Sequence, residues 1–73
     1  MEQDIFKTFA EKLRELIESE NISVNEFSKR IGIPQQTLSR YLLCQREVTL
    51  VNLCKIADYF HEDIDFLLGR KEY

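Results

Sequence analysis

The chain has 73 residues, a net charge of −3 and 44% hydrophobic residues. A domain of this size buries only about 60% of the surface that its unfolded chain exposes, so an enclosed active site is not expected. No apolar run approaches the roughly 18 to 20 residues of a membrane span, and the N-terminal Met-Glu-Gln-Asp lacks the basic region of a secretory signal. We therefore expect a single cytoplasmic domain over residues 1–73 with no membrane partner.

The chain has two cysteines and one histidine. Cys44 and Cys54 are too few and too far apart for a zinc site, and a cytosolic compartment would keep them reduced. We expect both to be buried structural thiols. His61 falls in a predicted loop with no nucleophile at a suggestive spacing, so we expect no enzyme activity, no metal site and no cofactor.

The first predicted helix covers residues 4–19. Its apolar residues recur at intervals of three and four, which is the pattern of an amphipathic helix. Asp4 or Gln3 would cap its start, and Asn21 tolerates the left-handed conformation that often ends a helix. The charged residues of its outer face, Arg14 among them, indicate an ordinary solvated surface.

The second predicted helix covers residues 24–31. Ser23 and Glu26 have the spacing of a capping box, in which each side chain accepts from the other residue's backbone amide. Gly32 ends this helix, because a residue without Cβ adopts a left-handed conformation at no steric cost.

The third predicted helix covers residues 34–43. Pro34 suits its start, because proline has no amide hydrogen to donate and fixes φ near the helical value. Leu38 and Leu42 lie on one face of this helix, with Tyr41 beside them. The opposite face carries Gln35, Gln36, Ser39 and Arg40.

Two further helices are predicted over residues 50–60 and 64–68. Thr49 and Asp63 would cap them, and Gly69 would end the last one. The expected inner stripe of the fourth helix is Leu50, Leu53, Cys54, Ala57 and Phe60. The sequence therefore predicts an all-α fold, a compact bundle of five helices.

Basic residues concentrate in one part of the chain. From Phe27 to Arg46 there is no acidic residue, and the same window contains Lys29, Arg30 and Arg40. Charges more than about 10 Å away are largely screened near physiological salt. A local basic face can therefore bind nucleic acid although the whole chain is acidic. Taken alone, the window is also compatible with an ordinary solvated face.

Two helices joined at Gly32, with the small residue Ser28 four positions earlier, match the helix-turn-helix unit. With the flanking helices, the sequence resembles the phage-repressor and Cro type of helix-turn-helix domain, the XRE family, over roughly residues 9–69. The residues that carry this resemblance are Leu13-Arg14-Glu15-Leu16, Ser23 with Glu26-Phe27, Ile31-Gly32-Ile33-Pro34, Thr37-Leu38-Ser39-Arg40-Tyr41, Leu53-Cys54-Lys55-Ile56-Ala57 and Asp65-Phe66-Leu67-Leu68-Gly69.

The resemblance implies a lambda-repressor-like fold in which the third helix lies in the major groove of double-stranded DNA. It implies base contacts from Gln35, Gln36, Ser39 and Arg40. It implies backbone contacts from Thr37, Lys29, Arg30 and Arg46. The implied function is that of a sequence-specific transcription regulator, a repressor that reads a palindromic operator.

The sequence departs from the family pattern at three places, one of which is Phe66, where an acidic residue is frequent. Val24 stands where a glutamine often contacts a phosphate. Leu42, Leu43 and Cys44 replace a common Glu-Asn-Gly, which removes the glycine that usually takes the left-handed position. We therefore expect the third helix to end differently or to run on.

Aromatic residues near the C-terminal end suggest a partner surface. We expect a homodimer through Tyr59, Phe60, Phe66 and Tyr73, although Tyr59 and Phe60 are equally compatible with a small core. An alternative function is a protein-interaction module, such as an antitoxin or anti-repressor with weak or no DNA binding. Three features favour that alternative: the negative net charge of the chain, Val24 and the Leu42-Leu43 pair.

Overall fold

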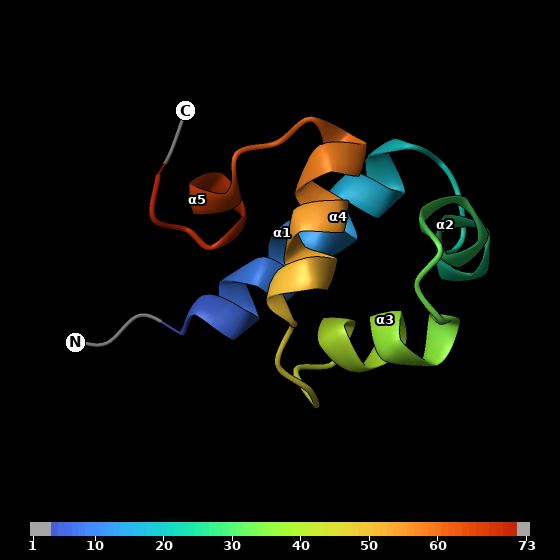
Figure 1. Ribbon diagram of the computed structural model, residues 1–73, viewed down its shortest axis with the longest axis horizontal. Helices are drawn as coiled ribbons and strands as arrows, with labels where there is room; N and C mark the ends of the chain where they lie inside the picture. Colours follow the sequence, from blue (N-terminus) through green and yellow to red (C-terminus); the bar gives the residue numbers. More distant parts are fainter. Residues whose placement is uncertain (1–3, 72–73) are drawn as a thin grey trace.

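The computed structural model describes residues 4–71, which form five helices and no strand (Figure 1). This confirms the predicted all-α class. The observed bounds differ from the expected ones by at most one residue. They are α1 (Ile5–Ser19), α2 (Val24–Ile31), α3 (Gln35–Leu42), α4 (Leu50–Phe60) and α5 (Ile64–Leu67).

Four helices begin at a side chain that accepts a hydrogen bond from the first turn, as the sequence predicts. Asp4 accepts from two amides of α1, each at 3.1 Å. The Ser23 hydroxyl accepts from the third residue of α2 at 3.0 Å, and the Thr49 hydroxyl accepts from the third residue of α4 at 3.1 Å. Asp63 caps α5 at 3.3 Å. Since the first amides of a helix have no partner within it, these bonds fix where each helix starts.

Glu26 does not complete the predicted capping box. Its Oε2 atom accepts from Nε of Arg30 at 3.1 Å, one helical turn further along α2. An arginine at this spacing forms an ion pair with the carboxylate, in which both partners are charged, whereas the backbone amide of Ser23 is neutral. The side chain of Glu26 therefore points along the helix and not back to Ser23.

All five helices are followed by a residue with positive φ. These residues are Asn21 (57°), Gly32 (77°), Cys44 (57°), His61 (54°) and Gly69 (76°). A left-handed residue turns the chain away from the helix axis and lets the next amides reach back to the last carbonyl groups. Each helix therefore ends sharply, which keeps the connections between the helices short.

The expectation that α3 would end differently without a glycine is wrong. Cys44 takes the left-handed position and donates from its amide to the carbonyl of Tyr41 at 3.1 Å, while the amide of Gln45 donates to the carbonyl of Arg40 at 2.8 Å. These two bonds form a Schellman motif. They offset the roughly 1–2 kcal/mol that a side chain costs in this conformation.

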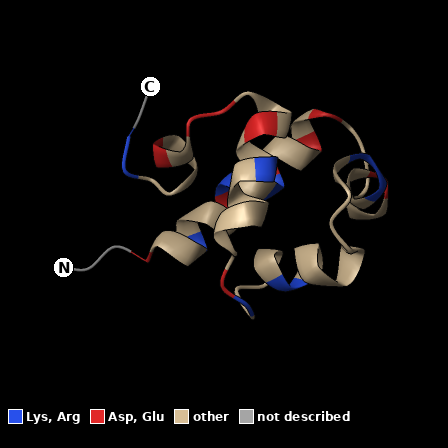
Figure 2. Ribbon diagram, in the orientation of Figure 1, with Lys and Arg blue, Asp and Glu red and all other residues tan. Residues whose placement is uncertain are grey.

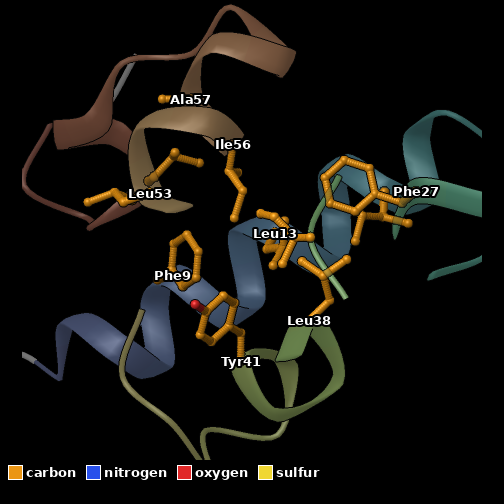
Figure 3. Packing of buried hydrophobic residues seen from close by; sticks show 11 residues of the cluster. Phe9, Leu13, Phe27, Leu38, Tyr41, Leu53, Ile56 and Ala57 are labelled. Carbon is orange, nitrogen blue, oxygen red and sulfur yellow. The ribbon is translucent and has the colours of Figure 1, made fainter. Parts of the chain in front are cut away.

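The core lies around α1, which crosses behind α4 in the middle of the molecule (Figure 1). Figure 3 shows side chains from α2, α3 and α4 converging on Phe9 and Leu13. The ring of Tyr41 packs edge-on against Phe9, with centroids 6.2 Å apart. The buried cluster is Phe9, Leu13, Ile17, Phe27, Ile33, Leu38, Tyr41, Leu53, Ile56, Ala57 and Leu67.

The predicted inner stripe of α4 is partly wrong. Leu50 is 80% exposed and Cys54 is exposed, whereas Ile56 is fully buried. Leu53, Ile56 and Ala57 form one face by helical spacing, and a stripe that starts at Leu50 fits the same alternation equally well. Packing against α1 selects the face that contains Ile56.

The expectation of buried thiols is also wrong, because both cysteines are free and exposed. Cys44 lies in the turn after α3, and Cys54 lies on the outer face of α4. Neither thiol belongs to the core.

Tyr59 and Phe60, two of the residues expected at a dimer interface, pack against α2. The ring of Phe27 stacks on Phe60 at 5.3 Å and meets Tyr59 edge-on at 5.2 Å. Phe66 is half-buried under the ammonium of Lys12, which lies 4.6 Å from its ring centroid. Tyr73, the fourth expected residue, lies outside the described residues.

Candidate nucleic-acid interface

The turn between α2 and α3 is held by the backbone and by one hydroxyl. Gly32 has a φ of 77°, and its amide donates to the carbonyl of Ser28 at 2.9 Å. The Ser28 hydroxyl in turn donates to the carbonyl of Ile33 at 2.6 Å. Ile33 is buried, so it anchors the turn in the core. The small residue before the glycine thus does more than leave space, since it also bonds the two sides of the turn together.

Helix α3 has one buried and one open face. Leu38 and Tyr41 are buried, which fixes the rotation of the helix about its axis. At 100° per residue, the polar residues then fall on the side opposite to the core. Gln35, Gln36 and Arg40 are exposed and Ser39 is half-buried on this polar face, which we define by these four residues.

A side-chain hydrogen bond joins α3 to α4. The Tyr41 hydroxyl accepts from Nδ2 of Asn52 on α4 at 2.9 Å. Thr37 is half-buried at the edge of the polar face. The polar face therefore stands on a helix whose inner side is packed and hydrogen-bonded.

The polar face has no acidic neighbour on α3, and basic residues stand on α2 and in the segment after α3. Figure 2 shows no acidic residue on α3, whereas acidic residues mark α5 and the end of α4. Lys29 and Arg46 are exposed, and neither makes an ion pair within the described part of the chain. Their charges are therefore not compensated by an ion pair within residues 4–71.

Arg30, another expected backbone contact, is engaged within the molecule. It bonds to Glu26, and its Nη1 lies 4.0 Å from Oε1 of Glu20, which also accepts from the Tyr59 hydroxyl at 2.9 Å. Hydrogen bonding to Tyr59 and then to Glu26 raises the pKa of Arg30 above its ordinary value. Part of its charge is thus compensated by two carboxylates.

Arg14 lies beside the end of α3, although the sequence indicated only a solvated charge. Its Nη2 donates to the carbonyl of Leu42 at 3.4 Å, across 28 residues of sequence. Arg14 also lines a hollow together with Ser39, Leu42 and Leu43. The sequence contains no signal for this contact, because it depends on how α1 crosses α3.

The profile of the helix-turn-helix family matches residues 13–67, which covers the turn, the polar face and the packing helices around them. The chain belongs to the XRE type of this helix-turn-helix family. No curated protein and no solved structure gives a significant match.

Membership in the family indicates what kind of molecule such a polar face contacts. Helix-turn-helix domains of this type bind DNA in transcription regulators. Helix α3 is the second helix of the unit, the one that such domains place in the major groove. Within residues 4–71, no helix combines the length and the apolar character that a bilayer span requires.

Proposed function

We propose that this helix-turn-helix domain is a sequence-specific repressor that reads its operator through the polar face of α3. The observation that supports the proposal most directly is the exposed and acid-free surface of Gln35, Gln36, Ser39 and Arg40, held by buried residues on the other side of the helix. A major groove admits an α-helix, and only there does each base pair present a distinct set of donors and acceptors.

Each residue of the polar face has a chemical role in this proposal. The amides of Gln35 and Gln36 each pair with N6 and N7 of adenine as acceptor and donor together. Arg40 reaches a guanine or a phosphate, and Ser39 bonds to a base edge. Thr37, at the edge of the face, donates its hydroxyl to a phosphate or places its methyl group against a thymine.

The phosphate contacts in this proposal come mainly from Lys29 and Arg46. Contacts of this kind set the position of the protein on the duplex and carry no sequence information by themselves. Arg30 contributes less, because Glu26 and Glu20 already compensate part of its charge.

We further propose that the repressor acts as a homodimer on a palindromic site. A twofold dimer places two copies of α3 about one turn of DNA apart. The second copy would pair through α4 and α5, where Phe66 is half-buried and where Leu50 and Val51 are 80% and 66% exposed.

A binding-site selection from random DNA tests the function. We expect a palindrome to be recovered. Replacing Gln35 or Gln36 with alanine should then remove about 1–3 kcal/mol of preference for the base that it contacts, measured as the ratio of affinities for the selected site and its single-base variants. Replacing Lys55 with alanine is the control, because this residue lies on α4 and is not part of the polar face, and the change should leave that ratio unchanged.

Equal losses on the selected site and on random DNA for the glutamine variants would contradict base readout by these residues. A selection that enriches no sequence would instead favour the second candidate function, a module that binds another protein. The exposed apolar side chains of Leu43, Leu50 and Val51 favour that candidate, since surfaces of this kind mark protein interaction sites.

A further inference from the structure

Arg14 lies at the C-terminal end of α3, where its side chain bonds to a backbone carbonyl. The last four carbonyl groups of α3 have no partner within the helix. Leu43, Gln45 and Cys44 donate their amides to the first three of these groups, those of Ser39, Arg40 and Tyr41. The fourth carbonyl, that of Leu42, accepts from Arg14 at 3.4 Å.

This bond uses only a small part of the hydrogen-bonding capacity of the Arg14 guanidinium. A guanidinium carries five N–H donors, and the bond to Leu42 takes one of them at a long distance. Arg14 makes no ion pair among residues 4–71. Leu42 has no charge to compensate it. The remaining donors and the positive charge are therefore available to an anion.

The open side of Arg14 faces a hollow of about 180 Å³ between three helices. Ser23 and Val24, at the start of α2, form one wall, and Leu42 of α3 forms another. Glu18 also lines it, although its carboxylate makes no ion pair with Arg14. Val24 has no donor or charge in its side chain, so any anion in this hollow must be neutralised from α1.

A second hollow, of about 210 Å³, joins Arg14 to the polar face. It is lined by Arg14, Ser39, Leu42 and Leu43. Ser39 belongs to the face that we propose to enter the major groove. When that face contacts base edges, the sugar-phosphate backbone beside the groove passes the same edge of α3, where Arg14 stands.

We propose that Arg14 binds a backbone phosphate of the operator at this edge, in the place where Val24 supplies no contact. The inference rests on the proposed DNA-binding function. It adds a phosphate contact from α1, outside the helix-turn-helix unit. Arg14 thus bridges the end of the recognition helix and the DNA, through Leu42 on one side and a phosphate on the other.

The test is the salt dependence of DNA binding by Arg14→Gln, with Lys7→Gln as the matched control. Both changes remove one positive charge from an exposed position on α1. The logarithm of affinity falls with the logarithm of salt by about 0.9 for each phosphate contact. We expect Arg14→Gln to lower that slope by about 1, on selected and random DNA alike, and Lys7→Gln to leave it unchanged. Between 50 and 200 mM salt, the wild-type affinity should fall about three- to fourfold more than that of Arg14→Gln.

The slope separates a phosphate contact from a purely structural role. If Arg14 only capped α3, its loss would lower the affinity and the melting temperature without changing the slope. Arg14→Lys keeps the charge and should restore the slope. Equal slopes for wild type and Arg14→Gln would overturn the inference while the DNA-binding function stands. Absence of DNA binding by the wild type at low salt would overturn both.

Discussion

Cys44 shows how a helix can end sharply without glycine. Its φ of 57° belongs to a region that side chains other than those of asparagine and aspartate rarely adopt. The conformation persists because the two bonds of the Schellman motif and the bond from Arg14 satisfy the neighbouring carbonyl groups. The left-handed residue is therefore imposed by its surroundings and not chosen by its own preference.

Cys44→Gly should stabilise the protein. Glycine removes the Cβ penalty at positive φ, and its greater freedom in the unfolded chain cancels part of the gain. We expect the free energy of unfolding to rise by about 1 kcal/mol, and the melting temperature by about 4–8 °C, in thermal denaturation followed by circular dichroism. Cys44→Ala keeps the penalty and is the control. Equal stability of the two variants would show that the backbone here is not strained.

At the scale of elements, the junction of α2 and α3 depends on a single side-chain bond. The Ser28 hydroxyl joins α2 to the carbonyl of Ile33 across the turn, at 2.6 Å and partly shielded from water. This side-chain bond and the backbone conformation of Gly32 together fix the angle at which the two helices cross. The polar face of α3 is positioned relative to α2 by both.

Ser28→Ala should loosen this junction. We expect a loss of about 1 kcal/mol in the free energy of unfolding, since the variant leaves the Ile33 carbonyl without its partner. Urea denaturation measures it. Ser19→Ala removes a comparable hydroxyl-to-carbonyl bond at the exposed end of α1 and should cost less, because water replaces it there. Equal costs for the two variants would mean that the shielding of the turn contributes nothing.

The sequence predicted local features of the fold better than distant ones. The caps at Ser23 and Thr49 and the turn at Gly32 depend on a few adjacent residues, and the structure confirms them. The predicted rotation of α4 about its axis was wrong. Two apolar stripes fit its alternation of apolar and polar residues, and only packing against α1 distinguishes them. The sequence also did not predict the partners of Arg30, since Glu20 and Tyr59 approach it from other elements.

The same difference between local and long-range features holds for the candidate interface. Periodicity on α3 predicted which residues are exposed, because Leu38 anchors the opposite side of the same short helix. Arg14 was missed, because its approach to Leu42 joins two segments 28 residues apart. The family profile supports the DNA-binding role, while the individual base contacts remain part of the proposal.

At the scale of the whole molecule, the start of α4 is the part of the surface that best suits a second copy. Leu50 and Val51 are exposed there, beside Cys54 on the same side of the helix. The two charged residues of α4, Lys55 and Asp58, cancel one another. A surface that is apolar and locally neutral does not repel its own copy, although the chain as a whole carries a charge of −3.

Val51→Glu should weaken the proposed dimer without unfolding the monomer. An acidic residue in the first turn of a helix is favourable for that helix, whereas a charge opposes burial against a partner. We expect dimerisation to need at least about tenfold more protein, since burying a valine stabilises by roughly 1.5–3 kcal/mol. Light scattering over a concentration series measures the mass.

Leu43→Lys is the matched control for this experiment. It changes another exposed hydrophobic residue, 61% exposed, at the end of α3, where a positive charge suits the helix terminus. Its dimerisation should equal that of the wild type. A wild-type mass of one chain at tens of micromolar, with and without DNA, would contradict the dimer itself.

The bond between Tyr41 and Asn52 has a consequence for operator geometry. It joins the helix that would enter the groove to the helix that would face the second copy, and both helices also pack into the same core. In the proposed dimer we therefore expect the distance between the two copies of α3 to be fixed by the protein. One extra base pair between the half-sites rotates one of them by about 34–36° around the duplex axis. The duplex would then have to twist to bring both half-sites back to the two copies of α3. The proposed repressor would therefore select operators by the spacing of their half-sites as well as by their bases.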